Sequence, residues 1–185
     1  ILLSIICLTL WSCNSYKKSI RKDTKLCLKN QTKSNSPLDL FKVYSNFENE
    51  LIKHELLKDK SLDSYIYLYD SILISKRKIS QSILRNIKNS YSDFEVFNIN
   101  SPSNFSSGLT CVLSAIEKNQ VEKDFEIYKS KIELLLKSND IYFYTHLKEV
   151  IKNTPKNQFK HIEYRYIAIA AIINYFYIEL NFEKI

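Results

Sequence analysis

Apolar side chains recur at helical spacing along most of the chain after residue 36. The pattern is clearest in residues 120–138, where apolar positions alternate at spacings of four and three and charged residues occupy the opposite side. These apolar positions are Val121, Phe125, Tyr128, Ile132 and Leu135. This arrangement is typical of an amphipathic helix that turns one face to a core. Similar stripes predict further helices in residues 36–60, 61–91, 140–153 and from Thr154 onward.

The last of these helices contains a stretch that is apolar on nearly every side, YIAIAAIINYFYI. A helix without a polar face is buried on all sides, so we expect it at the centre of a bundle. Arg165 and Glu179 bound the stretch and leave only 13 residues between them. A membrane-spanning helix needs about 20 apolar residues, so this stretch is too short to span.

The helical pattern is interrupted between residues 92 and 108. Alternation near 94–99 allows one short extended segment, and Pro102 and Gly108 indicate a loop. The stretch LTCVLSAIEKN after it is predicted to be a short helix that starts near Ser106. The whole chain contains one Gly and three Pro, too few for the many tight turns of a sheet-rich fold. The predicted fold class is therefore all-α, an irregular bundle of five to six helices in a single domain, residues 37–185.

The chain begins with an uncharged apolar run, residues 1–12, whose length matches the core of a signal peptide. It starts with Ile and lacks a basic leader, so we expect the given sequence to be truncated at its start. Leu10-Trp11-Ser12-Cys13 resembles the lipobox of bacterial lipoprotein precursors. The resemblance implies lipidation of Cys13 and a lipid-anchored protein of the bacterial cell envelope, on the periplasmic face or the cell surface. A plain secretory signal and a buried N-terminal helix are the alternatives.

Basic residues concentrate just after Cys13. The chain has a net charge of +7, and residues 14–36 carry seven basic side chains and one acidic one. Large apolar residues are few there, so residues 13–36 are predicted to be a lipidated cysteine followed by a flexible basic tether. Such a tether favours an anionic lipid surface. The domain after it is nearly neutral, which argues against a nucleic-acid partner.

The sequence leaves the roles of two of the four cysteines open. Cys27 and Cys111 are an even pair, which can form a disulfide in an oxidising compartment. Cys111 also follows a predicted loop at the start of a helix, where a thiol becomes more acidic. With His146 or His161 as its base, Cys111 would serve a thiol hydrolase. Its neighbours Val112 and Leu113 instead suit a buried structural cysteine.

The sequence gives little support for a nucleotide-binding, redox or metal site. The single glycine excludes phosphate-binding and dinucleotide-binding loops, and neither Cys-x-x-Cys nor His-Glu-x-x-His occurs. Glu50 with His54, and His146 with Glu149, share helix faces as metal ligands do, but ion pairing at the surface explains both pairs. No metal and no cofactor are predicted.

The tyrosines of YIYLY, residues 65–69, point to different faces of a helix, so at least one should be exposed and suited to contact a protein. The leading hypothesis is thus a non-enzymatic binding or structural lipoprotein that contacts another envelope protein. An inhibitor or immunity-type protein is a narrower form of it, and the thiol hydrolase is the competing class.

Overall fold

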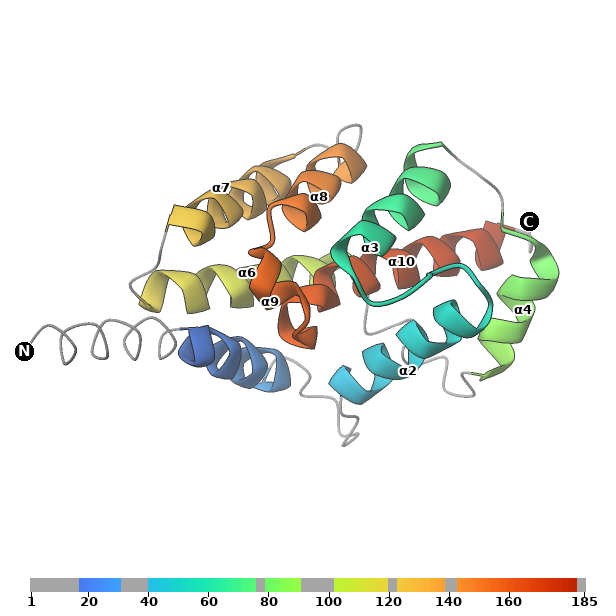
Figure 1. Ribbon diagram of the computed structural model, residues 1–185, viewed down its shortest axis with the longest axis horizontal. Helices are drawn as coiled ribbons and strands as arrows, with labels where there is room; N and C mark the ends of the chain where they lie inside the picture. The colour runs from blue at the N-terminus through green and yellow to red at the C-terminus, as the bar shows by residue number, and fades with distance from the viewer. Residues whose placement is uncertain are drawn as a thin grey trace, which may run out of the picture.

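A computed structural model describes residues 17–30, 40–75, 79–90, 102–119, 123–138 and 143–182. These ranges contain helices and no strand, which confirms the all-α class. After a helix over 17–30 come α2 (Leu40–Lys53), α3 (Leu62–Tyr69), η1 (Asp70–Ile74), α4 (Gln81–Ser90), α6 (Pro102–Lys118), α7 (Lys123–Lys137), α8 (Phe143–Lys152), α9 (Lys156–Phe159) and α10 (Ile162–Phe182) (Figure 1).

The number of helices is larger than the sequence predicted. With α3 and the π-helix η1 counted as one continuous helix, the described ranges hold nine, so the predicted five to six is too low. The strand-like alternation of Tyr65–Tyr69 proves to be helix, and Ser61 caps it by accepting from the backbone N–H of Ser64. The extended segment predicted near 94–99 lies outside the described residues.

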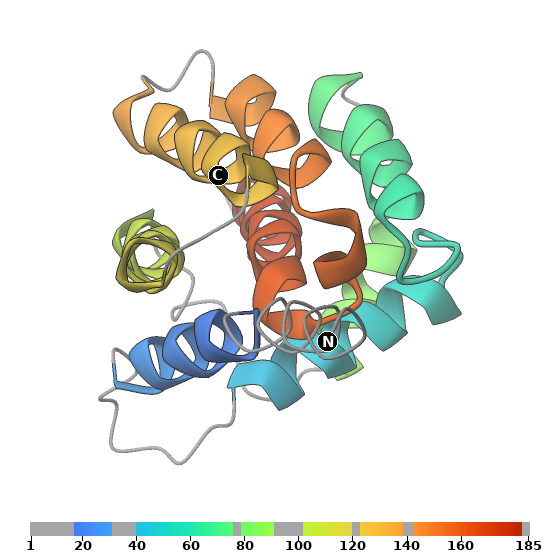
Figure 2. The same ribbon diagram turned by 60° about the vertical axis from the view of Figure 1, so that its left-hand side comes forward.

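Helix α10 is the centre of the bundle, as its composition predicted. Every residue from 164 to 173 is buried. The helix packs against α2, α6, α8 and α9, and Figure 2 shows the other helices arranged around it. Ala168, Ala170 and Ala171 are all buried and small, so neighbouring helices can approach α10 closely. In the part of the chain that is described, no helix combines the length and apolarity needed to cross a membrane.

Helix α6 begins earlier than the sequence predicted. We expected a loop through Pro102 and Gly108, but both residues lie inside α6. Pro102 is its first residue, a position where proline loses no helical hydrogen bond. Gly108 lies close to α10, because a Cβ there would lie 3.0 Å from the hydroxyl of Tyr166, tighter than an ordinary contact. The glycine therefore permits close contact between two helices and does not break one.

The single C-terminal helix expected from Thr154 is two helices, α9 and α10, with a break at Lys160 and His161. Arg165 accounts for this break. Its Nη1 donates to the backbone carbonyls of Phe159 and Lys160, which turn toward the guanidinium. The His161 N–H bonds only three residues back, to Gln158, so the helix tightens and ends there.

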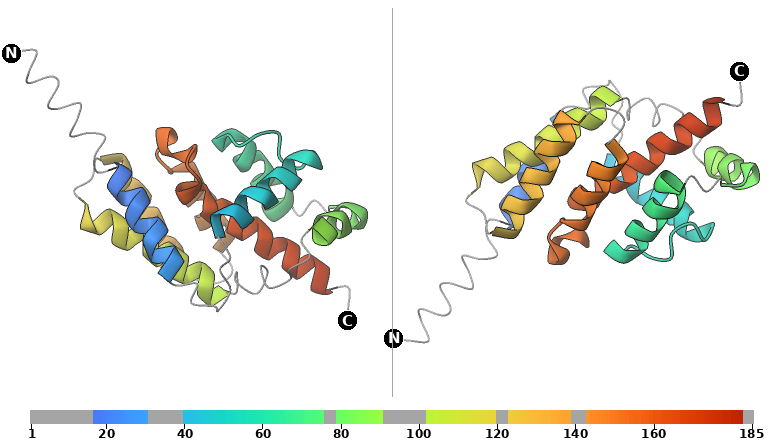
Figure 3. Two further views of the ribbon diagram at one scale, coloured as in Figure 1. Left: turned by 90° about the horizontal axis from the view of Figure 1, so that it is seen from below. Right: turned by 90° about the horizontal axis from the view of Figure 1, so that it is seen from above.

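The largest correction concerns the predicted tether. Residues 17–30 form a helix, and the packed domain therefore begins before residue 37. Ile20 and Leu28 are buried in the same core as α10, which the few apolar residues of this segment did not reveal. A disulfide joins Cys27 to Cys111 on α6, with Cα atoms 5.6 Å apart. Figure 3 shows this helix alongside α6 at one end of the molecule.

Candidate functional site

The residues proposed for thiol chemistry do not form a catalytic group in the structure. Cys111 is 1% exposed and its sulfur is bonded to that of Cys27, so it offers no thiolate. His146 lies on α8, and His161 lies between α9 and α10. Cys13, the predicted lipidation site, lies outside the described residues.

His161 serves to hold helix 17–30 against the bundle. Nη1 of Arg21 lies 2.7 Å from Nδ1 and 2.9 Å from Nε2 of His161. Since a guanidinium can only donate, the imidazole accepts, and this requires its neutral form. Burial, together with the positive charge of Arg21, lowers the pKa of His161 below its usual value. His161 therefore faces Arg21, and the sulfur of Cys111 is held in the disulfide, so the two do not form a base and nucleophile.

The acidic residues of the two helical acid–histidine pairs form ion pairs near the surface. Glu50 lies 3.2 Å from Nζ of Lys53 and 3.6 Å from Nε2 of His54. Glu149 lies 3.9 Å from Nζ of Lys131 and 3.7 Å from that of Lys152. Within the described ranges, no three His, Cys, Asp or Glu side chains gather closely enough to hold a metal ion.

The most conspicuous polar feature is an ion pair inside the bundle. Glu48 on α2 is 0% exposed and Arg165 on α10 is 5% exposed. Arg165 donates to Glu48 twice, from Nε to Oε1 at 2.7 Å and from Nη2 to Oε2 at 3.0 Å. This two-pronged geometry is the strongest form of an arginine–carboxylate contact.

Two further donors complete the surroundings of Glu48. The hydroxyl of Tyr65 donates to Oε1 at 2.6 Å, and Nζ of Lys60 lies 3.1 Å from Oε2. Burial, and then the charge of Glu48, raise the pKa of Tyr65 well above its usual value, so its hydroxyl keeps its proton. These contacts satisfy Glu48 inside the fold, and the cluster ties α2, α3 and α10 together.

The clearest exposed apolar feature surrounds Tyr67 on α3. Tyr65 and Tyr69 are 0% exposed, whereas Tyr67 is 68% exposed, which matches the prediction that one tyrosine of YIYLY faces outward. Beside Tyr67 lies a groove of about 290 Å³. We call it the Tyr67 groove. Its lining is Glu55, Leu56, Tyr67, Leu68, Ser71, Ile72, Ile79, Ser80 and Ile83.

Local backbone irregularities build this groove. The chain leaves α2 through Glu55, whose φ of 57° is left-handed, and this turn brings Leu56 to the groove. Two other lining residues, Ser71 and Ile72, belong to the π-helix η1. A π-helical turn is rare and often occurs at functional sites. Ile79 and Ile83 close the groove from the start of α4.

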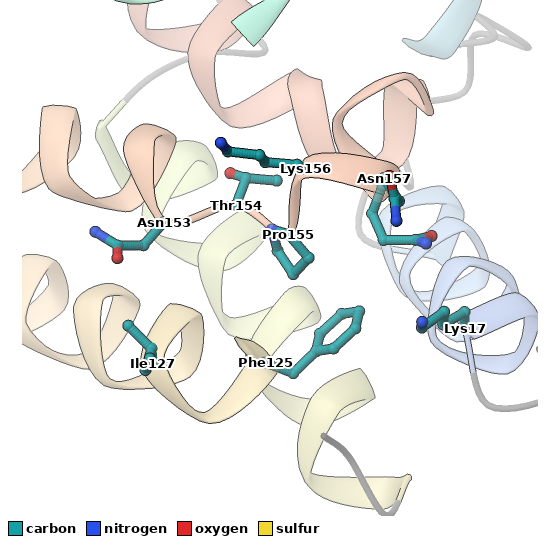
Figure 4. A pocket seen from close by; sticks show the side chains of 9 residues that line it. Lys17, Phe125, Ile127, Asn153, Thr154, Pro155, Lys156 and Asn157 are labelled. Atoms are coloured by element: carbon teal, nitrogen blue, oxygen red, sulfur yellow. The ribbon is translucent and has the colours of Figure 1, made fainter. Parts of the chain in front are cut away.

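A second hollow, of about 430 Å³, lies between helix 17–30, α7 and the turn from α8 to α9. Figure 4 shows Lys17 entering from helix 17–30 and Phe125 and Ile127 from α7. Its polar lining serves the local fold. Asn153 and Thr154 donate to the carbonyls of Glu149 and Val150 and so cap the end of α8.

Of these two hollows, the Tyr67 groove is the one whose lining includes an exposed aromatic side chain, since Phe125 in the other is buried. No protein-family model, curated protein or solved structure matches the sequence or its fold. The function is therefore argued from the chemistry of these surfaces.

Proposed function

We propose that this chain is a lipid-anchored protein of the bacterial envelope whose helical domain binds another protein through the Tyr67 groove. The observation that carries the proposal is the exposure of Tyr67, at 68%, beside an apolar hollow. Tyrosine is enriched at protein interfaces because it adds a large apolar area and a polar tip. The hollow of about 290 Å³ falls just below the range of about 300–1,000 Å³ usual for small-molecule sites. It suits an apolar side chain of a partner.

The anchor is supported by the sequence before helix 17–30. Leu10 and Ser12 match the lipobox positions, and Cys13 would carry the lipid. The Cys27–Cys111 disulfide is consistent with an oxidising compartment such as the periplasm.

The arrangement of the helices suits an anchored binding protein. Helix 17–30 lies toward one end of the molecule, and α3 and α4 lie toward the other (Figures 1 and 3). A lipid on Cys13 would therefore hold the end that carries helix 17–30 near the membrane. The Tyr67 groove would face away from the anchor, where another envelope protein can reach it.

The anchor is tested by metabolic labelling with an alkyne fatty acid in bacteria that express the chain with a complete signal sequence. We expect label in the wild-type protein and none in Cys13→Ser, since the thioether and the acyl chains depend on that thiol. Cys7→Ser is the matched control and should keep the label, because residue 7 precedes the predicted cleavage site. Equal labelling of Cys13→Ser, or none in the wild type, would contradict the anchor.

The groove is tested by a photo-crosslinking residue at position 80, at the start of α4. We expect one adduct of defined mass in envelope fractions, and Tyr67→Ala should reduce its yield strongly. Truncating an aromatic hot spot costs about 2 kcal/mol of binding, or about thirtyfold in affinity. A crosslinker at Lys137, exposed on α7, is the matched control and should give no such adduct. An adduct that survives Tyr67→Ala unchanged would refute the role of the groove.

A further inference from the structure

Four lysines of helix 17–30 lie on one exposed face, and we call them the lysine row. They are Lys18, Lys22, Lys25 and Lys29. Their spacings of four, three and four place them within an arc of about 60° around a helix that turns 100° per residue. At 1.5 Å per residue the row is about 16 Å long. The sequence presents these charges as a dispersed basic segment, whereas the helix arranges them in a line.

The opposite side of the helix is fixed to the bundle, so the row has one orientation. Ile20, Thr24 and Leu28 are buried. The disulfide between Cys27 and Cys111 ties the helix to α6.

Asp23 is the single acidic residue in 17–30, and it lies away from the row, 3.2 Å from Nζ of Lys118 on α6. Asn119 also donates to it. Asp23 therefore pairs with side chains from α6.

We propose that the lysine row binds the anionic headgroups of a phospholipid membrane and lays helix 17–30 along its surface. The inference deepens the proposed function and rests on it, because Cys13 supplies the anchor. Only residues 14–16 separate Cys13 from Lys17, a reach of at most about 14 Å. A lipid on Cys13 would thus hold the row within reach of the headgroups.

The neighbours of the row suit a membrane surface. Leu26 flanks it and is 54% exposed, an apolar side chain that can enter the headgroup region. Lys25 Nζ lies 5.6 Å from the ring centre of Phe41, which holds this part of the row beside the start of α2. The rest of the chain is close to neutral, so a single row of four lysines gives a footprint for charged headgroups and is narrow for a nucleic acid.

The test uses residues 13–185, the form that the proposed cleavage leaves, with Cys13→Ser, so that neither the apolar run nor an acyl chain contributes. The vesicles are either pure phosphatidylcholine or contain 30% phosphatidylglycerol. We expect co-sedimentation only with the anionic vesicles. Raising the salt from 0.1 to 1 M should abolish it, because the Debye length falls from about 10 to about 3 Å. Each lysine contributes about fivefold to such binding, so Lys18→Gln with Lys22→Gln should lower the partition coefficient about 25-fold.

The matched control is Lys58→Gln with Lys137→Gln, which removes the same charge from exposed positions outside helix 17–30. It should bind as the parent does. Equal losses in both pairs would show a net-charge effect and overturn the proposal, as would equal binding to both vesicles or none to either. Preferential binding to a DNA or RNA duplex would also overturn it. The lipid label on Cys13 reports the anchor separately, so failure of the row and failure of the anchor give different results.

Discussion

Replacing Glu48 by alanine is expected to lower the free energy of unfolding by about 3–5 kcal/mol, the cost of leaving one partner of a buried ion pair alone. The change leaves the guanidinium of Arg165, at 5% exposure, without its carboxylate. It also removes the acceptor of the Tyr65 hydroxyl. The measurement is urea denaturation of the full chain at pH 7 with the disulfide intact, followed by far-UV circular dichroism.

Glu50→Ala is the matched control on the same helix. Glu50 is half-buried and pairs with Lys53 and His54 near the surface, so its loss should cost less than about 1 kcal/mol. Replacing Glu48 by leucine and Arg165 by methionine together should cost less than either single change, because no charge is then left buried. Similar losses for Glu48→Ala and Glu50→Ala would contradict the stabilising role of the buried pair.

The sequence pattern predicts a helix best where its apolar positions are also the positions that are buried in the fold. The stripe of 120–138 is α7, and the all-apolar stretch is the buried core of α10. The buried ion pair of Glu48 could have been predicted in the same way. Glu48 follows Tyr44 by four residues and precedes Leu51 by three, so it occupies the apolar face of α2, where an acidic residue requires a buried partner.

The incorrect predictions for the start of α6 and for residues 17–30 have a common physical cause. Both segments are shaped by contacts with residues that are distant in sequence. Gly108 is tolerated in α6 because Tyr166, 58 positions later, fills the space beside it. Helix 17–30 buries few large side chains of its own and depends on Cys111 and His161 from other helices. Local propensity contains no information on such partners, so the segment was predicted to be a tether.

The features of the candidate site also differ in whether the local sequence could predict them. The exposure of Tyr67 could be predicted from helical geometry, because three tyrosines at alternate positions cannot share one buried face. The Tyr67 groove could not be predicted, since it depends on the turn at Glu55 and on the π-helix η1. The alternatives for Cys111 could be separated only by the position of Cys27 in space.

Loss of the disulfide is expected to lower the free energy of unfolding by about 4 kcal/mol. Cys27 and Cys111 are 84 residues apart, and a cross-link that closes so long a loop strongly restricts the unfolded chain. Cys27→Ser should show this loss in guanidinium chloride denaturation, and reduction of the wild-type protein should reproduce it. Hydrogen exchange should rise first in residues 17–30, because the bond ties this helix to α6 and α10 is buried independently of it.

Leu26→Ser is the matched control for this change, since residue 26 adjoins Cys27 but is 54% exposed and outside the core. It should alter the free energy of unfolding by less than about 0.5 kcal/mol, as surface substitutions usually do. If Cys27→Ser and the wild type unfold at the same denaturant concentration, the bond contributes nothing to the native fold. Helix 17–30 would then owe its orientation to its buried side chains Ile20 and Leu28 and to the contact between Arg21 and His161, rather than to the covalent link.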